Sequence, residues 1–151
     1  MRPTTKRLVS VAALTFAAST FGAVLAIIFQ WPTQFDGSGS PNVTAGEFVT
    51  GGTATSIPLI PWIALGVFAL LARSRRWWGT FGVVGLCLLG PLFVIGGMGE
   101  AFAPATPHVP RAVLVVSGVV AGLLGLTLLA SGVRDLIGRW RMRGLSKTAR
   151  V

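Results

Sequence analysis

The chain has 151 residues, of which 52% are hydrophobic, and its 20 glycines raise the apolar share to about 65%, above the roughly 45–50% of soluble domains. Charged residues make up 11% of the chain, with a formal net charge of +9, and there is one cysteine. This composition excludes a soluble catalytic domain, an intrinsically disordered chain and a disulfide scaffold.

Four long apolar runs follow one another along the chain, at residues 8–29, 57–72, 77–98 and 112–133. Three of them have 22 residues, which as a helix span about 33 Å and match a hydrocarbon core of roughly 30 Å. The run 57–72 has only 16 residues and needs flanking residues to cross. No run alternates with period two, which disfavours a β-barrel. The predicted fold is all-α: residues 1–151 form a single membrane domain, a four-transmembrane-helix bundle.

The first run admits one alternative. Residues 1–7 are basic and precede an apolar stretch, as in a cleavable signal peptide. The apolar core of 22 residues is longer than the roughly 7–15 of a signal peptide, and the best cleavage site, at residues 24–26, is poor. We therefore expect a retained anchor.

The positive charges predict the orientation of the bundle. With four spans, both termini and the inner hairpin 73–76 share one side, which carries 12 of the 13 Lys and Arg residues. Only Arg111 lies opposite. Because positive loops stay in the cytoplasm, we expect a multi-pass protein of the plasma (cell) membrane with both termini cytoplasmic. Arginine outnumbers lysine 11 to 2, which is typical of a GC-rich, bacterial genome.

The remaining segments are two outer loops, at 30–56 and 99–111, and a basic cytoplasmic tail, 134–151. In the tail, apolar residues at 133, 136, 137 and 140 predict a helix that turns to lie along the inner leaflet and ends at Gly144. The expected partner of the basic segments is anionic lipid, with no role in nucleic-acid binding. The residues expected to face this lipid are Arg73, Arg75, Arg76, Arg139, Arg141 and Arg143.

The four runs contain no Asp, Glu, Lys, Arg or His. A proton-coupled transporter usually has a titratable group inside the membrane, a membrane thiol oxidase needs paired cysteines, and a membrane cytochrome needs histidine ligands within helices. Cys87 is alone and the single histidine, His108, lies in a loop. The sequence therefore argues against these three classes, and we expect no cofactor, metal or catalytic residue.

Three side chains flank the second outer loop: Glu100, His108 and Arg111. They are weak candidates for a site that binds a ligand or a metal, but one histidine and one carboxylate are too few for a transition metal. We expect them to be solvated loop charges.

Glycines in the last two runs suggest close helix packing. Gly118, Gly122, Gly125 and Gly132 form one stripe that includes a GxxxG pair and a seven-residue repeat. The stripe serves either packing inside the bundle or a face for a partner or a second copy. Gly90 and Pro91 predict a kink, because Pro91 frees the carbonyl of Cys87.

From this pattern the sequence favours a small non-catalytic integral membrane protein, an accessory or assembly subunit that acts through helix packing in the cell envelope. The alternative is a small oligomeric transporter or channel for a neutral or apolar solute, formed through the last span. A third hypothesis is an enzyme or sensor that uses Glu100 and His108.

Overall fold

The computed structural model describes residues 1–31, 49, 51–53, 55–74, 76–102 and 109–148, with side chains described up to residue 142. Within these residues the named elements are four helices: α1 (Pro3–Ile28), α3 (Leu59–Ala72), α4 (Trp77–Phe102) and α5 (Arg111–Thr148). This part of the chain has no β-strand, only one isolated bridge between Thr53 and Ser56. The all-α prediction is confirmed.

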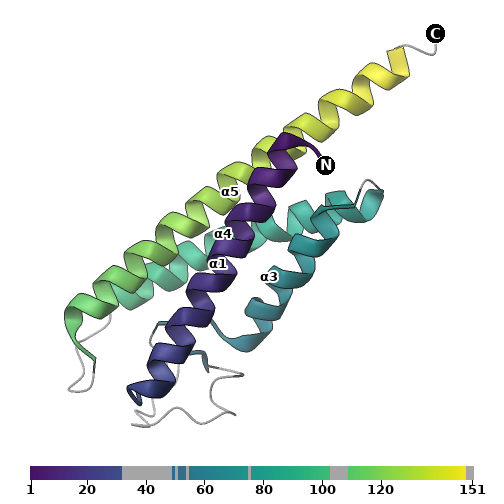
Figure 1. Cartoon of the computed structure of the whole chain (residues 1–151). Coiled ribbons are helices and arrows are strands. Elements are labelled where there is room, and N and C mark those ends of the chain that lie inside the picture. Colours follow the sequence, from purple (N-terminus) through teal and green to yellow (C-terminus); the bar gives the residue numbers. More distant parts are fainter. Residues whose placement is uncertain (32–48, 50, 54, 75, 103–108, 149–151) are drawn as a thin grey trace.

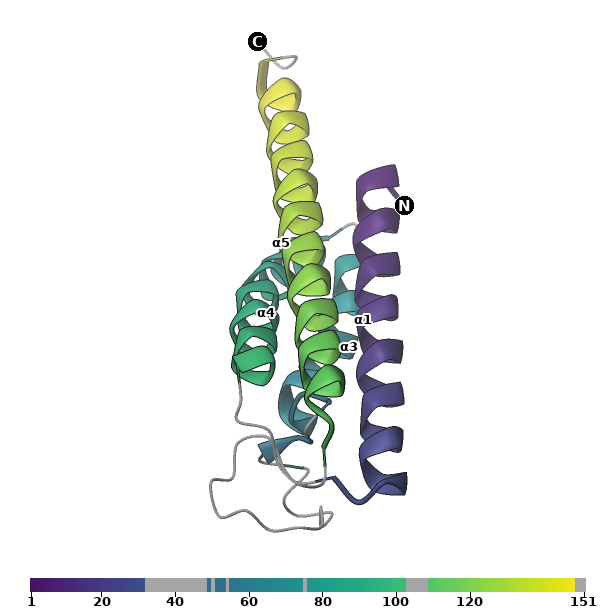
Figure 2. The same cartoon turned by 90° about the vertical axis from the view of Figure 1, so that its left-hand side faces the viewer.

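The helices form a closed ring in the order α1, α3, α4, α5. α4 lies along α5 in the most extensive contact, α3 packs against α4 and α1, and α1 also contacts α5. The N-terminus lies beside the second half of α5, at the end where α3 leads into α4 (Figure 1). A view from the side shows α1 and α5 running next to each other (Figure 2).

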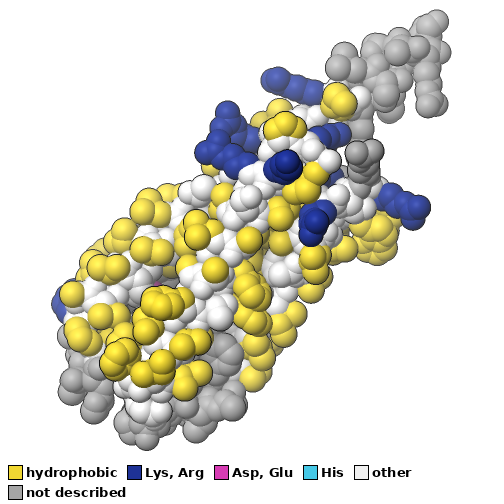
Figure 3. All heavy atoms as spheres, in the orientation of Figure 1, with side chains coloured by type: hydrophobic (Ala, Val, Ile, Leu, Met, Phe, Trp, Pro, Cys, Tyr) yellow, Lys and Arg dark blue, Asp and Glu magenta, His cyan; other side chains and the backbone are white. Residues whose placement is uncertain are grey.

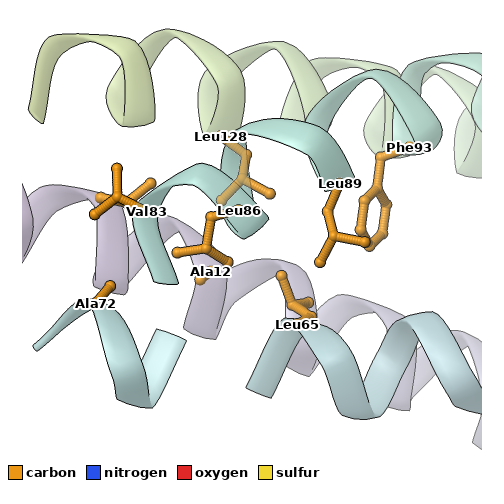
Figure 4. Close-up of a cluster of buried hydrophobic side chains, with 9 residues drawn as sticks. Ala12, Leu65, Ala72, Val83, Leu86, Leu89, Phe93 and Leu128 are labelled. Carbon is orange, nitrogen blue, oxygen red and sulfur yellow. The ribbon is translucent and has the colours of Figure 1, made fainter. Parts of the chain in front are cut away.

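One apolar cluster joins all four helices, from near the N-terminus to the middle of the bundle. Figure 4 shows side chains from each helix meeting there. An aromatic stack of Phe16 on Trp62, with ring centroids 4.1 Å apart, adds to the α1–α3 contact. The buried members of the cluster are Leu8, Ala12, Leu65, Ala72, Val83, Leu86, Leu89, Phe93 and Leu128.

The outer surface of the helices is apolar. Phe21, Ile63, Ile95 and Leu123 are examples of large exposed side chains, one from each helix, and Figure 3 shows such side chains over the body of the molecule. Three helices, α1, α4 and α5, are long and apolar enough to cross a membrane. α3 has 14 residues and measures only about 21 Å. The helices therefore indicate a small membrane protein with three helices of spanning length.

The last helix differs from the prediction. α5 continues as one helix of 38 residues, so the expected turn onto the leaflet and the end at Gly144 are wrong. The physical reason is that Leu128, Ser131, Asp135 and Arg139 are all buried on one face. This face carries the contact with the other helices beyond residue 133 and keeps the tail segment in line with the bundle.

Candidate functional site

The two ends of the bundle differ in charge. Figure 3 shows Lys and Arg side chains gathered over the end where the N-terminus lies, whereas the exposed Arg111 stands at the start of α5. The structure has a notable feature at each end: an apolar cavity away from the N-terminus and a buried polar network beside it.

The cavity has a volume of about 880 Å³ and lies between α1, α4, α5 and the segment that leads into α3. α1 and α4 stand opposite each other in the ring, and small side chains on the walls leave the space between them open. These small residues are Ala18, Gly96, Ala112 and Ala121.

Larger apolar side chains complete the walls of the cavity. Phe21, Leu92, Ile95 and Val116 line it and are also exposed on the outside of the bundle. A cavity whose wall residues reach the outer surface opens sideways between the helices. In a bilayer such an opening faces the acyl chains of lipids.

Most hydroxyl groups around the cavity are engaged by nearby carbonyls. Thr15 donates to the carbonyl of Val11 at 2.9 Å, and Ser117 donates to that of Leu114 at 3.1 Å. Thr55 donates to the carbonyl of Gly22 at 2.7 Å, which ties the segment before α3 to α1. Hydroxyls that are satisfied in this way leave the cavity wall apolar.

Glu100 is the one charged side chain among the described residues that line the cavity. It lies in the last turn of α4, because the helix continues to Phe102, and only 6% of it is exposed. The expectation of a solvated loop charge is therefore wrong for Glu100. Arg111 is exposed at the start of α5, and His108 lies outside the described residues.

At the other end, the carboxylate of Asp135 joins α1 to α5. Asp135 is 0% exposed, and its Oδ1 accepts hydrogen bonds from the hydroxyls of Thr4 at 2.5 Å and Thr5 at 2.7 Å. Its Oδ2 accepts one from Nε of Arg139 at 2.7 Å. Nη2 of Arg139 then donates to the carbonyl of Ala72 at 2.9 Å, at the C-terminal end of α3. The network thus connects three helices.

Sequence reasoning missed this network. Part of its signal was present in the sequence, because Asp135 is the one acidic residue on the basic side of the predicted topology. It also stands four residues before Arg139, a spacing that brings opposite charges together on a helix. The partners on α1, Thr4 and Thr5, lie 131 and 130 residues away and carry no local signal. Glu100, Asp135 and Arg139 are all buried, so the described interior carries charged side chains toward both ends of the bundle.

The structure separates the basic residues that the sequence grouped as lipid-facing. Arg139 is 8% exposed and part of the network, whereas Arg73, Arg76 and Arg141 are exposed. Arg75 and the side chain of Arg143 lie outside the described residues.

The four glycines of the predicted stripe on α5 do not share one environment. A methyl group added at Gly118 would collide with the backbone of Gly97, at Gly125 it would lie 2.5 Å from the carbonyl of Gly90, and at Gly132 it would meet the thiol of Cys87. These three glycines therefore face α4, and their close approach explains the extent of the α4–α5 contact. Gly122 differs, since a methyl group there meets nothing within 4 Å.

α4 continues through Pro91 as a single helix. Pro91 is exposed, whereas Gly90 is buried against α5. The kink at these residues stays a prediction.

Among the residues that the structure describes, no three His, Cys, Asp or Glu side chains come together as a metal site would require. The sequence matches no protein-family model, no curated protein and no solved structure.

Proposed function

We propose that the protein is a non-catalytic membrane protein that holds one elongated apolar molecule, such as an acyl chain or a neutral solute, in the cavity between α1, α4 and α5. The observation that carries this proposal is the cavity itself. Its volume of about 880 Å³ falls within the roughly 300–1,000 Å³ of small-molecule sites. Its walls, apolar apart from Glu100, suit a ligand that brings few polar groups, and its sideways opening provides an entry from the bilayer.

The topology is part of the same proposal. We infer four crossings in the plasma membrane with both termini in the cytoplasm, α3 being completed by the residues that precede it. The basic side chains gathered at the end with the N-terminus (Figure 3) support this orientation.

Filling the cavity tests the function. Gly96 lines the cavity, and a methyl group there meets nothing within 4 Å, so Gly96→Phe brings a ring into the cavity from a position where the first side-chain carbon meets no neighbour. Gly122 is equally open but does not line the cavity, which makes Gly122→Phe the matched control. The probe is a phosphatidylcholine with a diazirine on one acyl chain, crosslinked to the purified protein in vesicles and mapped by mass spectrometry.

We expect crosslinks to concentrate on wall residues of α4 and α5, and to fall about tenfold in Gly96→Phe, because a ring displaces the chain from a cavity of this size. Gly122→Phe should label like the wild type. Equal labelling of all outward faces, or an unchanged yield in Gly96→Phe, would contradict the proposal.

The second candidate is the accessory or assembly subunit that the sequence favoured. Three of the four stripe glycines face α4, so they offer no free face to a partner. Gly122 supports this candidate, because its open position leaves room for another backbone to approach. Affinity purification in mild detergent tests it: recovery of the protein alone at monomer mass contradicts a subunit role.

An oligomeric transporter built through α5 predicts instead a self-associated species and solute flux in liposomes, both lost in Gly122→Leu.

A further inference from the structure

A second hollow, of about 350 Å³, lies at the basic end of the bundle, between the start of α1, the end of α3 and the second half of α5. Three arginines come to it from these three elements. Asp135 is not among the residues that line it. The lining consists of Met1, Arg2, Thr5, Ala72, Arg73, Ser74 and Arg139.

Within the part of the chain that the structure describes, only one of the three arginines has its charge compensated by a carboxylate. Arg139 forms an ion pair with Asp135, Nε to Oδ2, at 2.7 Å. Among the described side chains no carboxylate pairs with Arg2 or Arg73. The hollow therefore has an excess of positive charge at a place partly shielded from water, where an anion is attracted more strongly than at an open surface.

Arg2 supplies an independent observation. Its Nη1 is buried and has no hydrogen-bond partner, and it is the one side-chain nitrogen or oxygen in this condition in the described part of the chain. A buried donor without an acceptor is costly and rare in folded proteins. An acceptor group inside the hollow would satisfy it.

The hydroxyl groups at the hollow differ in what they can offer. The hydroxyl of Thr5 donates to Asp135 at 2.7 Å and has no second proton to give. The hydroxyl of Ser74 accepts from the backbone N–H of Arg76 at 3.2 Å, so its own proton stays available as a donor. Two uncompensated guanidinium groups and one hydroxyl proton form a set made only of donors.

We propose that this hollow binds a phosphate group, held by Arg2, Arg73 and the hydroxyl of Ser74. A phosphate has several acceptor oxygens and a negative charge, and arginine forms paired charge-assisted hydrogen bonds with it. The phosphate belongs either to an anionic phospholipid of the adjacent leaflet or to a soluble phosphate compound. The site is separate from the apolar cavity and does not depend on the proposed function.

The test measures binding to the purified full-length chain in an uncharged detergent. The lipid probe is dioleoylphosphatidylglycerol, its phosphate-free counterpart is dioleoylglycerol, and the soluble probe is inorganic phosphate. The variants are Arg2→Gln and Arg73→Gln. Arg76→Gln is the matched control, because Arg76 stands three residues from Arg73 and is exposed but does not line the hollow.

We expect Arg2→Gln and Arg73→Gln each to raise the Kd for phosphatidylglycerol about tenfold, the loss typical of one charged hydrogen-bond donor, and Arg76→Gln to leave it within about twofold. Dioleoylglycerol should bind far more weakly than phosphatidylglycerol. Competition by inorganic phosphate identifies a soluble ligand, and its failure to compete identifies a lipid headgroup; both results support the site.

Three results would overturn the proposal. The first is an equal loss of phosphatidylglycerol affinity in all three variants, which indicates a diffuse charge effect. The second is no loss of affinity in any variant, and the third is dioleoylglycerol binding as tightly as phosphatidylglycerol. Thermal melting of each variant checks that it folds. If Arg2→Gln is unstable, Ser74→Ala takes its place, with an expected loss of about threefold, and an unchanged Kd in Ser74→Ala and Arg73→Gln then refutes the site.

Discussion

Replacement of Asp135 by alanine should strongly destabilise the bundle. The carboxylate is 0% exposed and accepts three side-chain hydrogen bonds, from Thr4, Thr5 and Arg139. Its loss leaves the guanidinium of Arg139 buried without a counter-charge, and breaking a buried pair from one side costs about 3–5 kcal/mol. The expected loss of unfolding free energy is therefore about 4 kcal/mol, a large share of the roughly 5–15 kcal/mol of a typical protein.

The assay is reversible unfolding of the purified protein in mixed micelles of dodecyl maltoside and sodium dodecyl sulfate, followed by far-ultraviolet circular dichroism. Asp135→Asn keeps one acceptor oxygen and the size of the side chain, and should lose about half as much free energy. The double variant Asp135→Ala/Arg139→Ala removes the orphaned charge, so its loss should be smaller than the sum of the single losses by about 2 kcal/mol. Arg141→Ala, at an exposed position of the same helix, should stay within about 0.5 kcal/mol.

A loss in Asp135→Ala no larger than that in Arg141→Ala would refute the reasoning. Such a result would mean that the guanidinium of Arg139 moves into water once Asp135 is removed. The hydrogen bonds between the three helices would then contribute little to the unfolding free energy. Additive losses in the double variant would show that the two residues do not act on each other.

Two further predictions concern packing and topology. Gly125→Leu should cost about 3 kcal/mol, because its first side-chain carbon would already lie 2.5 Å from a carbonyl of α4, whereas Gly122→Leu should stay within about 0.5 kcal/mol in the same unfolding assay; equal losses would place both glycines against α4. In a Cys87→Ala background, a cysteine at Ser40 should react with a membrane-impermeant maleimide added to intact cells and one at Ser146 should react only after lysis; the reverse pattern would invert the proposed topology.

The helices could be predicted from the sequence because long runs without charge have few other stable forms in lipid. The positions at which the helices end could not be predicted in this way. Glu100 and Asp135 fall just outside the apolar runs. From sequence alone, a charged residue at that position indicates the start of a loop. In the structure both side chains are buried, so the helices that carry them continue past the limit that composition suggests.

The site was less predictable for a physical reason. A glycine repeat shows that two backbones approach each other, but it does not say whether the second backbone belongs to the same chain. A methyl group at Gly118 or Gly125 would collide with α4, whereas one at Gly122 would meet nothing within 4 Å. The cavity is a property of the space left between helices, and the network of Asp135 depends on threonines at the far end of the chain. Neither has a local pattern to detect.

The length of α5 has a consequence for whatever is attached to its end. A helix of 38 residues is about 57 Å long, and even at a tilt of about 40° only some 26 of its residues fit within a hydrocarbon core of roughly 30 Å. The remaining residues, roughly three turns, must therefore extend beyond the hydrocarbon core. A reporter domain fused to the end of α5 would therefore be joined to the bundle through an unbroken helix, and a rotation of the bundle would move that domain with it.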